Sequence, residues 1–297
     1  MPLVERAPAK INLGLHVLRK RPDGYHDVET VLHRIDWADT ITAQPADTLS
    51  MTCSDPALPT NEDNLCLQAA RRLAEAGDVA TGAELHLEKR VPYGTGLGGG
   101  SSDAAATLRL LTRLWDLDPP PKKLHTIARS IGSDVPFFLH EAPAAYATGR
   151  GDDLTPLYGN DHPYRLPYPV LVAVPAIQVA TPDAYAQVTP HDDGRPGLPD
   201  LVRSGDLARW QSALVNDFEP PITEQHAEVA AARSWLHEAG AAYVSLSGSG
   251  GAVFGVFETN EEAETAFEAG QSRTDELHLT PGPERSPRSR RGSANRT

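Results

Sequence analysis

The segment YGTGLGGGSSDAAATLRLL, from Tyr93 to Leu111, places five glycines and two serines directly before an alanine-rich run. A chain carries this much glycine only where the backbone turns tightly or approaches another group closely. The run that follows has apolar residues at Ala104, Leu108, Leu111 and Trp115, the spacing of one helical face. Loop amides and a helix N-terminus together form a cradle for phosphate. The segment therefore predicts an anion-binding loop, with a flexible linker or tight packing corner as the alternative.

Two well-known glycine patterns fit this loop poorly. Gly94-x-Gly96-x-x-Gly99 matches the dinucleotide fingerprint, but so glycine-rich a run matches many patterns by chance. The acidic ribose ligand of that fingerprint follows a second strand about 20 residues on, whereas Asp116 and Asp118 follow a helix pattern. A Walker A loop needs lysine after its last glycine, and here Ser101 follows instead. A third kind of anion loop remains.

Composition limits the class of protein. The chain has 297 residues, enough for two domains with separate cores, and 40% of them are apolar. Its net charge of −13 argues against a general nucleic-acid binder. No apolar run approaches the roughly 18 residues that span a bilayer, and the N-terminus has no signal-peptide pattern. Only two cysteines occur, so we expect neither disulfides nor a thiolate metal site, and a cytoplasmic location.

The first half of the chain alternates strand and helix patterns. Residues 10–18 alternate as a strand, a turn follows at 21–26, and 25–35 read as the return strand. On the first strand Lys10 and Asn12 share the polar face, which is typical of a solvated face. Helix patterns follow at 61–77, from about 102, and within 122–140, with a strand at 83–92. We assign 1–158 to an N-terminal domain that carries the glycine loop.

A segment rich in proline, glycine and polar residues, 158–169, marks the predicted domain boundary. Beyond it, a C-terminal domain over 165–275 reads as a strand, helices, a hairpin at 242–257 and a final helix, in all an α+β fold. The stretch 281–297 holds five arginines and one glutamate and no apolar core residues, so we predict a disordered basic tail.

Several motifs together resemble the GHMP kinases, small-molecule kinases with their own ATP loop. Three of them are "PAKINL…RPDGYH" from Pro8 to His26, the glycine loop, and "SLSGSGGAVFGVF" at 245–257. "GSDVPFF" at 132–138 and "GRGDDLTPL" at 149–157 fit the branch that phosphorylates the 2-hydroxyl of 4-diphosphocytidyl-2-C-methyl-D-erythritol, in the non-mevalonate route to isoprenoids. The resemblance implies a two-domain fold, with an N-terminal domain like domain 2 of ribosomal protein S5 and a ferredoxin-like C-terminal domain.

The same resemblance implies two catalytic residues. Lys10 would lie beside the catalytic carboxylate, keeping it ionised and offsetting charge on the transferred group. Asp134 would accept the proton of the substrate hydroxyl, mainly by orienting it, because phosphoryl transfer needs no strong base. Taken without the resemblance, Asp134 reads as a helix cap, since Asp before proline often caps.

The resemblance also implies the ligand contacts. ATP, with its Mg²⁺, would be bound by Asn64, Lys89, Pro92, Gly94, Gly96, Leu97, Gly98, Gly99, Gly100, Ser101 and Ser102. Ser101 or Ser102 is the candidate contact to Mg²⁺, and spacing names no acidic metal ligand. The acceptor would be held by Asn12, by Tyr25 and His26 at the cytosine, and by Thr181 and Tyr185. The hairpin turn 247–251 would support the glycine loop.

Three alternatives stay open at this point. Homoserine and mevalonate kinases are other GHMP kinases, but they have no cytosine for the Tyr25–His26 pair to recognise. A nucleotide-binding oxidoreductase would use the fingerprint match, and an RNA-binding protein would use the basic tail. The favoured interpretation is a small-molecule kinase without nucleic-acid or membrane partners, as a monomer or a homodimer.

Overall fold

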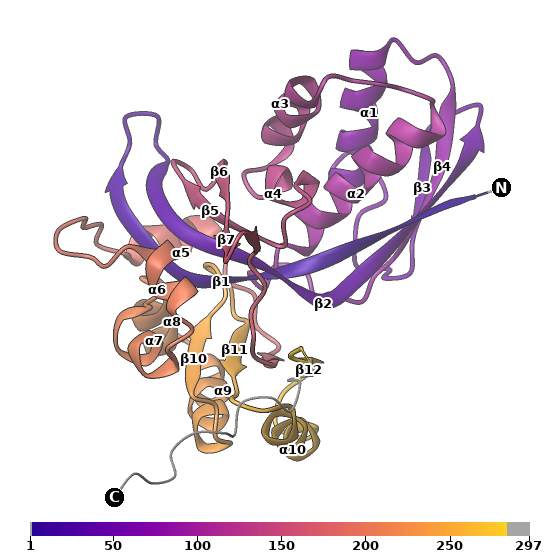
Figure 1. Ribbon diagram of the computed structural model, residues 1–297. Helices are drawn as coiled ribbons and strands as arrows, with labels where there is room; N and C mark the ends of the chain where they lie inside the picture. The colour runs from indigo at the N-terminus through magenta and orange to yellow at the C-terminus, as the bar shows by residue number, and fades with distance from the viewer. Residues whose placement is uncertain (1, 284–297) are drawn as a thin grey trace, which may run out of the picture.

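Two mainly antiparallel sheets organise the computed structural model, which describes residues 2–283 (Figure 1). The predicted tail lies outside the described residues from position 284 on. The larger sheet contains β1 (Leu3–Lys20), β2 (His26–Ala46), β3 (Ser50–Cys53), β4 (Gly82–Glu88), β5 (Ala144–Thr148) and β6 (Asp153–Pro156). Its order is β3-β4-β2-β5-β6, with β1 paired to β2 in one long hairpin. The only parallel pair in this sheet, as far as the structure describes it, is β3 with β4.

Four helices accompany the larger sheet, and all four contribute residues to the first core. They are α1 (Leu65–Gly77), α2 (Gly99–Leu114), α3 (Pro121–Ile131) and α4 (Val135–Leu139). Helix α2 begins at Gly99, three residues before the predicted start at Ser102, because Gly98 adopts the left-handed conformation that begins it. Helix α1 begins four residues later than predicted, at Leu65, because the Asn64 side chain caps it by accepting from the Cys66 amide.

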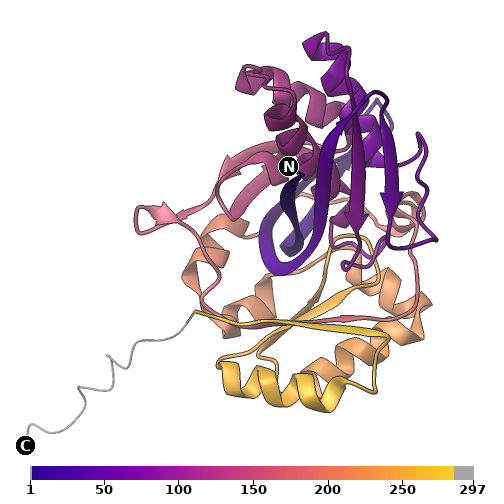
Figure 2. The same ribbon diagram turned by 90° about the vertical axis from the view of Figure 1, so that its right-hand side faces the viewer.

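The second sheet has the strand order β10-β11-β9-β12, the order of a ferredoxin-like fold. Its strands are β9 (Val170–Val174), β10 (Tyr243–Leu246), β11 (Val253–Val256) and β12 (Glu276–Thr280). Its helices are α5 (Thr181–Gln187), α6 (Leu198–Ser204), α7 (Leu207–Ala213), α8 (Glu219–Gln225), α9 (Ala227–Glu238) and α10 (Asn260–Gly270). Figure 2 shows α10 lying along the side of this sheet that faces away from the larger sheet.

A shared core joins the two sheets. Alternation along β9 sends Val172 into this core, with Ile11 of β1 and Trp210 of α7, and sends Leu171 into a third core under α8 to α10. The predicted boundary segment 158–169 lies between the sheets and contains the short pair β7 (Tyr158–Gly159) and β8 (His162–Pro163). The division into domains at 1–158 and 165–275 stays a prediction.

A buried ionic cluster fixes the point where β4 leads into the glycine loop. The Lys89 ammonium donates to Asp39 Oδ2 at 2.6 Å and to Asp103 Oδ2 at 2.9 Å. Asp39 Oδ1 also accepts from the amides of Arg90 and Val91. Both carboxylates are almost fully buried, so the cluster ties β2, the loop entry and α2 together. Burial raises the pKa of Asp103 to about 8, and its Oδ1 has no hydrogen-bond partner among the described residues.

This raised pKa predicts a pH-dependent stability. Because the pKa of Asp103 in the folded protein lies above the unfolded value of about 3.9, its favourable contribution is present at low pH and is lost as the pH rises to 8 and beyond. Asp103→Asn removes the titration and leaves an acceptor for Lys89. We expect the urea midpoint of Asp103→Asn to rise relative to that of the wild type as the pH is raised from 5 to 9. The exposed control Asp118→Asn should show the same dependence of urea midpoint on pH as the wild type. If Asp103→Asn also showed the wild-type dependence, the raised pKa of Asp103 would be contradicted.

Candidate active site

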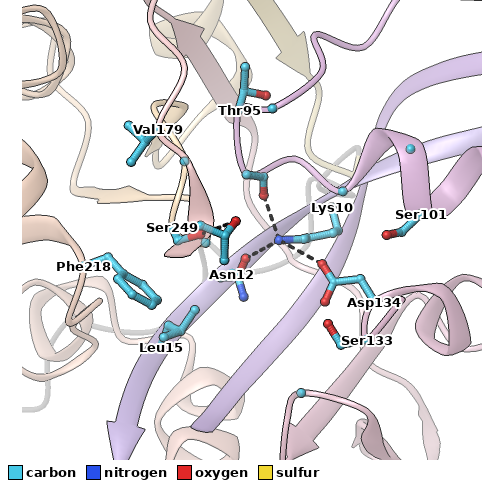
Figure 3. A pocket seen from close by; sticks show the side chains of 18 of the residues that line it. Lys10, Asn12, Leu15, Thr95, Ser101, Ser133, Asp134, Val179, Phe218 and Ser249 are labelled. Carbon is cyan, nitrogen blue, oxygen red and sulfur yellow. Dashed lines mark hydrogen bonds and ion pairs between the residues drawn. The ribbon is translucent and has the colours of Figure 1, made fainter. Parts of the chain in front are cut away.

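A cavity of about 750 Å³ opens between the two sheets, at the N-terminus of α2 (Figure 3). Its wall is formed by β1, the glycine loop, the turn before α4, the segment before α5 and the turn between β10 and β11. The close-up shows Lys10 and Asn12 of β1 and Asp134 of the turn before α4 converging on one point of this cavity. The sequence predicted this convergence only through resemblance.

Lys10 is buried, contrary to the solvated strand face that alternation suggested. Its ammonium donates to Asn12 Oδ1 at 2.6 Å and to the Gly96 carbonyl at 2.7 Å, and lies 3.6 Å from Asp134 Oδ2. Burial lowers the pKa of Lys10, and the Asp134 carboxylate opposes that shift. The strand face is buried because the glycine loop, 86 positions away in sequence, packs over it.

A bulge in β1 orients Asn12. Gly14 has φ of +75°, and the register with β2 shifts between Leu13 and Leu15. The Thr30 hydroxyl donates to the Gly14 carbonyl at 2.6 Å and accepts from Asn12 Nδ2 at 2.9 Å. With its Oδ1 bound to Lys10, the Asn12 amide can turn only its remaining N–H toward a ligand.

Asp134 stands at the N-cap position of α4 but does not act as a cap. Its side chain makes no capping hydrogen bond, and its backbone is already helical, with φ −83° and ψ −16°. The carboxylate instead faces Lys10 across the cavity wall and is 31% exposed. The reading of Asp134 as a simple helix cap is therefore wrong, and the carboxylate is available to a ligand.

The glycine loop packs backbone to backbone against the β10–β11 turn. A Cβ on Gly96 would lie 1.9 Å from the Ser247 carbonyl oxygen, and one on Gly250 would lie 2.1 Å from the Thr95 carbonyl carbon. Ala252 donates its amide to the Thr95 carbonyl at 3.0 Å. The predicted support of the loop by the 247–251 turn is confirmed, and protein packing alone explains two of these glycines.

Gly100 needs another explanation. It lines the cavity in the first turn of α2, and a Cβ there would meet only Leu65 Cδ1, at an ordinary 3.6 Å. The first intrahelical hydrogen bond is that of Ser102 to Gly98, so the amides of 99–101 have no acceptor within the helix. Free amides and the positive end of the helix dipole meet at this point, which suits an anion.

The loop residues of the predicted ATP site divide into those that line the cavity and those that do not. The cavity wall includes Pro92, Gly94, Gly96, Gly98, Gly99, Gly100 and Ser101. Leu97 and Ser102 point into the protein interior and are fully buried, so their side chains are not available to a ligand. Of the two serines proposed for Mg²⁺, Ser101 is the one that reaches the cavity.

The side chains of Asn64 and Lys89 form structural contacts outside this cavity. Asn64 caps α1 with its Oδ1 and donates its Nδ2 to the Pro59 carbonyl at 2.8 Å. Lys89 belongs to the buried ionic cluster and lines a second, neighbouring cavity of about 530 Å³, which shares Pro92, Thr95 and Gln178 with the first. Both residues are buried rather than at the surface, and a contact to adenine through that neighbouring cavity stays a prediction for Lys89.

The residues predicted to bind cytosine line a third cavity, of about 1030 Å³. Tyr25, His26, Thr181 and Tyr185 all line it. The rings of His26 and Tyr185 stack with centroids 4.7 Å apart and an angle of 14°. The structure thus pairs Tyr185 with His26, whereas the sequence suggested Tyr25 as its partner across a base. Thr181 accepts from Ser249 at 3.4 Å, which links this cavity to the loop-supporting turn.

Two functional candidates escaped the sequence analysis. Asn216 is buried and donates its Nδ2 to the carbonyls of Leu246 and Gly248, which holds the turn beside the loop. Arg150 lines both the first and the third cavity. The "GRGDD" motif contains Arg150, but the motif alone gave no role for it.

Few protein groups are available to a metal ion. Among the described residues, no group of three or more His, Cys, Asp or Glu side chains suits a metal ion. Mg²⁺ bound to nucleotide phosphates keeps most of its waters and needs only one or two protein oxygens. The Ser101 hydroxyl and the Asp134 carboxylate line the same cavity and fit that requirement.

Comparisons with known proteins agree with this architecture. The GHMP kinases N terminal domain model matches residues 64–142, and the GHMP kinases C terminal model matches residues 198–275. A solved homoserine kinase from Cytophaga hutchinsonii has a TM-score of 0.71 at 17% identity, covering 95% of each chain, which shows the fold alone. None of the helices in the described part of the chain has the length and apolar character that spanning a bilayer requires.

The similarity is higher within one branch. A 4-diphosphocytidyl-2-C-methyl-D-erythritol kinase from Salinibacter ruber is 65% identical over 95% of this chain and 100% of its own length, and one from Chlorobium chlorochromatii is 46% identical over 89% and 91%. A crystal structure of a 4-(cytidine 5'-diphospho)-2C-methyl-D-erythritol kinase has a TM-score of 0.78 at 33% identity, covering 94% of this chain and 98% of that one. The chain therefore belongs to the GHMP kinases, in the family of the 4-diphosphocytidyl-2-C-methyl-D-erythritol kinases.

Proposed function

We propose that this chain transfers the γ-phosphate of ATP to the 2-hydroxyl of 4-diphosphocytidyl-2-C-methyl-D-erythritol, as the names of its relatives indicate for them. The observation that carries the proposal is the pairing of the Lys10 ammonium with the Asp134 carboxylate between an anion cradle and an aromatic-lined cavity. The cytoplasmic location, and a monomeric or homodimeric state, belong to the same proposal.

The chemistry needs little covalent participation from the protein. Phosphoryl transfer proceeds through a loose transition state, so catalysis consists mainly of positioning and charge stabilisation. Asp134 accepts a hydrogen bond from the acceptor hydroxyl and takes its proton. Lys10 pairs with that carboxylate and offsets charge on the transferred group. The α2 amides and Ser101 hold the phosphates of ATP, and bound Mg²⁺, contacted by Ser101 or Asp134, would neutralise part of their charge.

The acceptor would extend from the first cavity into the third. Its hydroxyl lies by Asp134 and Asn12, and its base lies among Tyr25, His26 and Tyr185. The stacked His26 and Tyr185 rings support this arrangement, because an aromatic surface of this kind accepts a nucleobase. This placement stays part of the proposal.

Substrate choice tests the function directly. A coupled assay of ADP release should give turnover with ATP and 4-diphosphocytidyl-2-C-methyl-D-erythritol, and only background with mevalonate or homoserine. Comparable turnover with either of those alcohols, or none with the cytidine compound, would overturn the proposed substrate.

Removing the carboxylate that accepts the proton of the substrate hydroxyl should reduce turnover while the protein still folds. We expect Asp134→Asn to lower kcat by about 10²- to 10⁴-fold, the usual contribution of a positioned acid–base group. ATP affinity should stay close to wild type, and the helix should be unaffected because the side chain makes no capping bond. The thermal midpoint should fall, because the buried Lys10 ammonium loses its paired carboxylate. The exposed Asp192→Asn serves as a control. A folded Asp134→Asn enzyme with near-normal kcat would remove Asp134 from the mechanism.

Gly100 offers a clean test of the phosphate cradle. Gly100→Ala should weaken ATP binding by about 10- to 100-fold, because a methyl group takes the space that phosphate needs against the helix amides. Stability should hold or rise, since alanine favours a helix over glycine by about 0.5–1 kcal/mol. Gly197→Ala is the matched control, because its Cβ would meet no heavy atom within 4 Å. Calorimetric titration with ATP measures both, and an unchanged affinity for Gly100→Ala would exclude a phosphate at this turn.

A further inference from the structure

The third cavity is cationic in an acidic protein. Its wall carries Lys20, Arg129 and Arg150, and none of the described residues that line it is Asp or Glu. The chain as a whole has a net charge of −13, so this concentration of positive charge is local. Arg129 and Arg150 share a single carboxylate, that of Asp152, so the wall keeps an excess of positive charge that favours an anionic ligand. Aromatic residues alone would suffice for a base, so the positive charge requires a further explanation.

Arg150 lies where the third cavity meets the first. The two cavities share only Ser133, Arg150, Thr181 and Tyr185 among the described lining residues. Arg150 is the charged member of this group. The first cavity contains the Lys10–Asp134 pair, and the third contains Tyr25 and His26. A ligand that spans both cavities must pass the Arg150 guanidinium.

The β5–β6 turn is built to present this side chain. Gly149 and Gly151 flank Arg150 with φ of +65° and +89°, a conformation that favours glycine. The Val28 amide donates to the Gly149 carbonyl at 2.8 Å, and the Gly151 amide donates to the Thr148 carbonyl at 3.0 Å. These bonds fix the turn against the start of β2, directly beside Tyr25 and His26.

Asp152 aims the guanidinium. This buried carboxylate accepts from Arg150 Nη2 at 3.0 Å and from Arg129 at 2.8 and 3.0 Å, all on Oδ2. Burial alone would raise the pKa of Asp152, but the hydrogen bonds from both arginines outweigh it and lower the pKa, so the residue stays an anion. The Arg150 guanidinium also lies over the Tyr25 ring, 4.9 Å from its centroid. Its one hydrogen bond within the described chain uses one N–H of Nη2, which leaves Nε, Nη1 and the second N–H of Nη2 as donors.

We propose that Arg150 binds the diphosphate that joins the cytidine to the methylerythritol in the acceptor substrate, and so selects acceptors that carry it. This inference rests on the proposed function. A planar guanidinium with two neighbouring donors suits the oxygens of a diphosphate, and Asp152 on its far side holds it in one orientation. Arg129 shares Asp152 and acts as a positioning residue.

The test separates the diphosphate from the base. Affinities of CDP and of cytidine are measured by calorimetry with the ATP site saturated by a non-hydrolysable ATP analogue. Arg150→Gln should weaken CDP by about 10- to 100-fold, the effect of losing a charged hydrogen-bond pair, and should leave cytidine within about twofold. In steady-state assays the KM for the full acceptor should rise by a similar factor, while kcat and the KM for ATP change little.

Two further variants complete the design. Arg150→Lys keeps the charge but not the paired donors, so it should fall between wild type and Arg150→Gln, and it replaces Arg150→Gln if that variant does not fold. Arg71→Gln changes a half-exposed arginine of α1 that pairs with Glu62 and lines neither of the two cavities; it is the matched control and should match wild type.

The outcomes distinguish the inference from the proposed function. Wild-type enzyme without activity on the cytidine acceptor would contradict the proposed function. Activity in the wild type with unchanged CDP affinity and acceptor KM in both Arg150 variants would overturn only this inference. Equal losses for CDP and cytidine would also overturn it, because they would assign Arg150 to the base through its contact with Tyr25.

Discussion

The buried Lys10 ammonium is the interaction on which the candidate active site depends. A buried charge is costly unless it is paired and hydrogen-bonded. Lys10 meets that condition only because β1 supplies Asn12, the glycine loop supplies the Gly96 carbonyl, and the turn before α4 supplies Asp134. These three segments are distant in sequence, so the same pairing that satisfies the charge also assembles the site.

Close backbone packing supports this arrangement from the other side. Gly96 and Gly250 bring the glycine loop and the β10–β11 turn closer than any Cβ would permit. Asn216 then holds the turn from the interior. The loop is thus fixed between Lys10 on one side and the second sheet on the other. Such a loop presents its amides to phosphate without reorganising when ATP binds, which is the condition for effective charge stabilisation.

Much of this could be predicted from the sequence, but for two different reasons. Helix and strand periodicity predicted β1, α2 and the β10–β11 hairpin, because local apolar spacing governs them. The kinase fold and the Lys10–Asp134 pair came from motifs, since no local pattern brings residues 124 positions apart into contact. Alternation wrongly placed Lys10 on a solvated face, because the segments that bury it are remote in sequence. It also gave no sign that Leu97 and Ser102 turn inward while Ser101 faces the cavity.

The role of Arg150 is an example of what the sequence could not predict. Its importance follows from two cavities that meet at one turn, and a cavity has no signature in a sequence. The same holds for the Asp39–Lys89–Asp103 cluster, whose members come from β2, the loop entry and α2. In each case the sequence identified individual residues, but only their positions in the structure showed which have a structural role and which can contact a ligand.

A double-mutant cycle tests the central claim, that Lys10 and Asp134 act as one unit. The measurement is kcat for the wild type, Lys10→Met, Asp134→Asn and the double variant, each checked for fold and ATP binding. If the two side chains act together, the double variant should be no more than about threefold slower than the slower single variant, because residues of one catalytic unit are strongly non-additive. Losses that multiply across the two sites would contradict the account, since they would mean that each residue contributes independently.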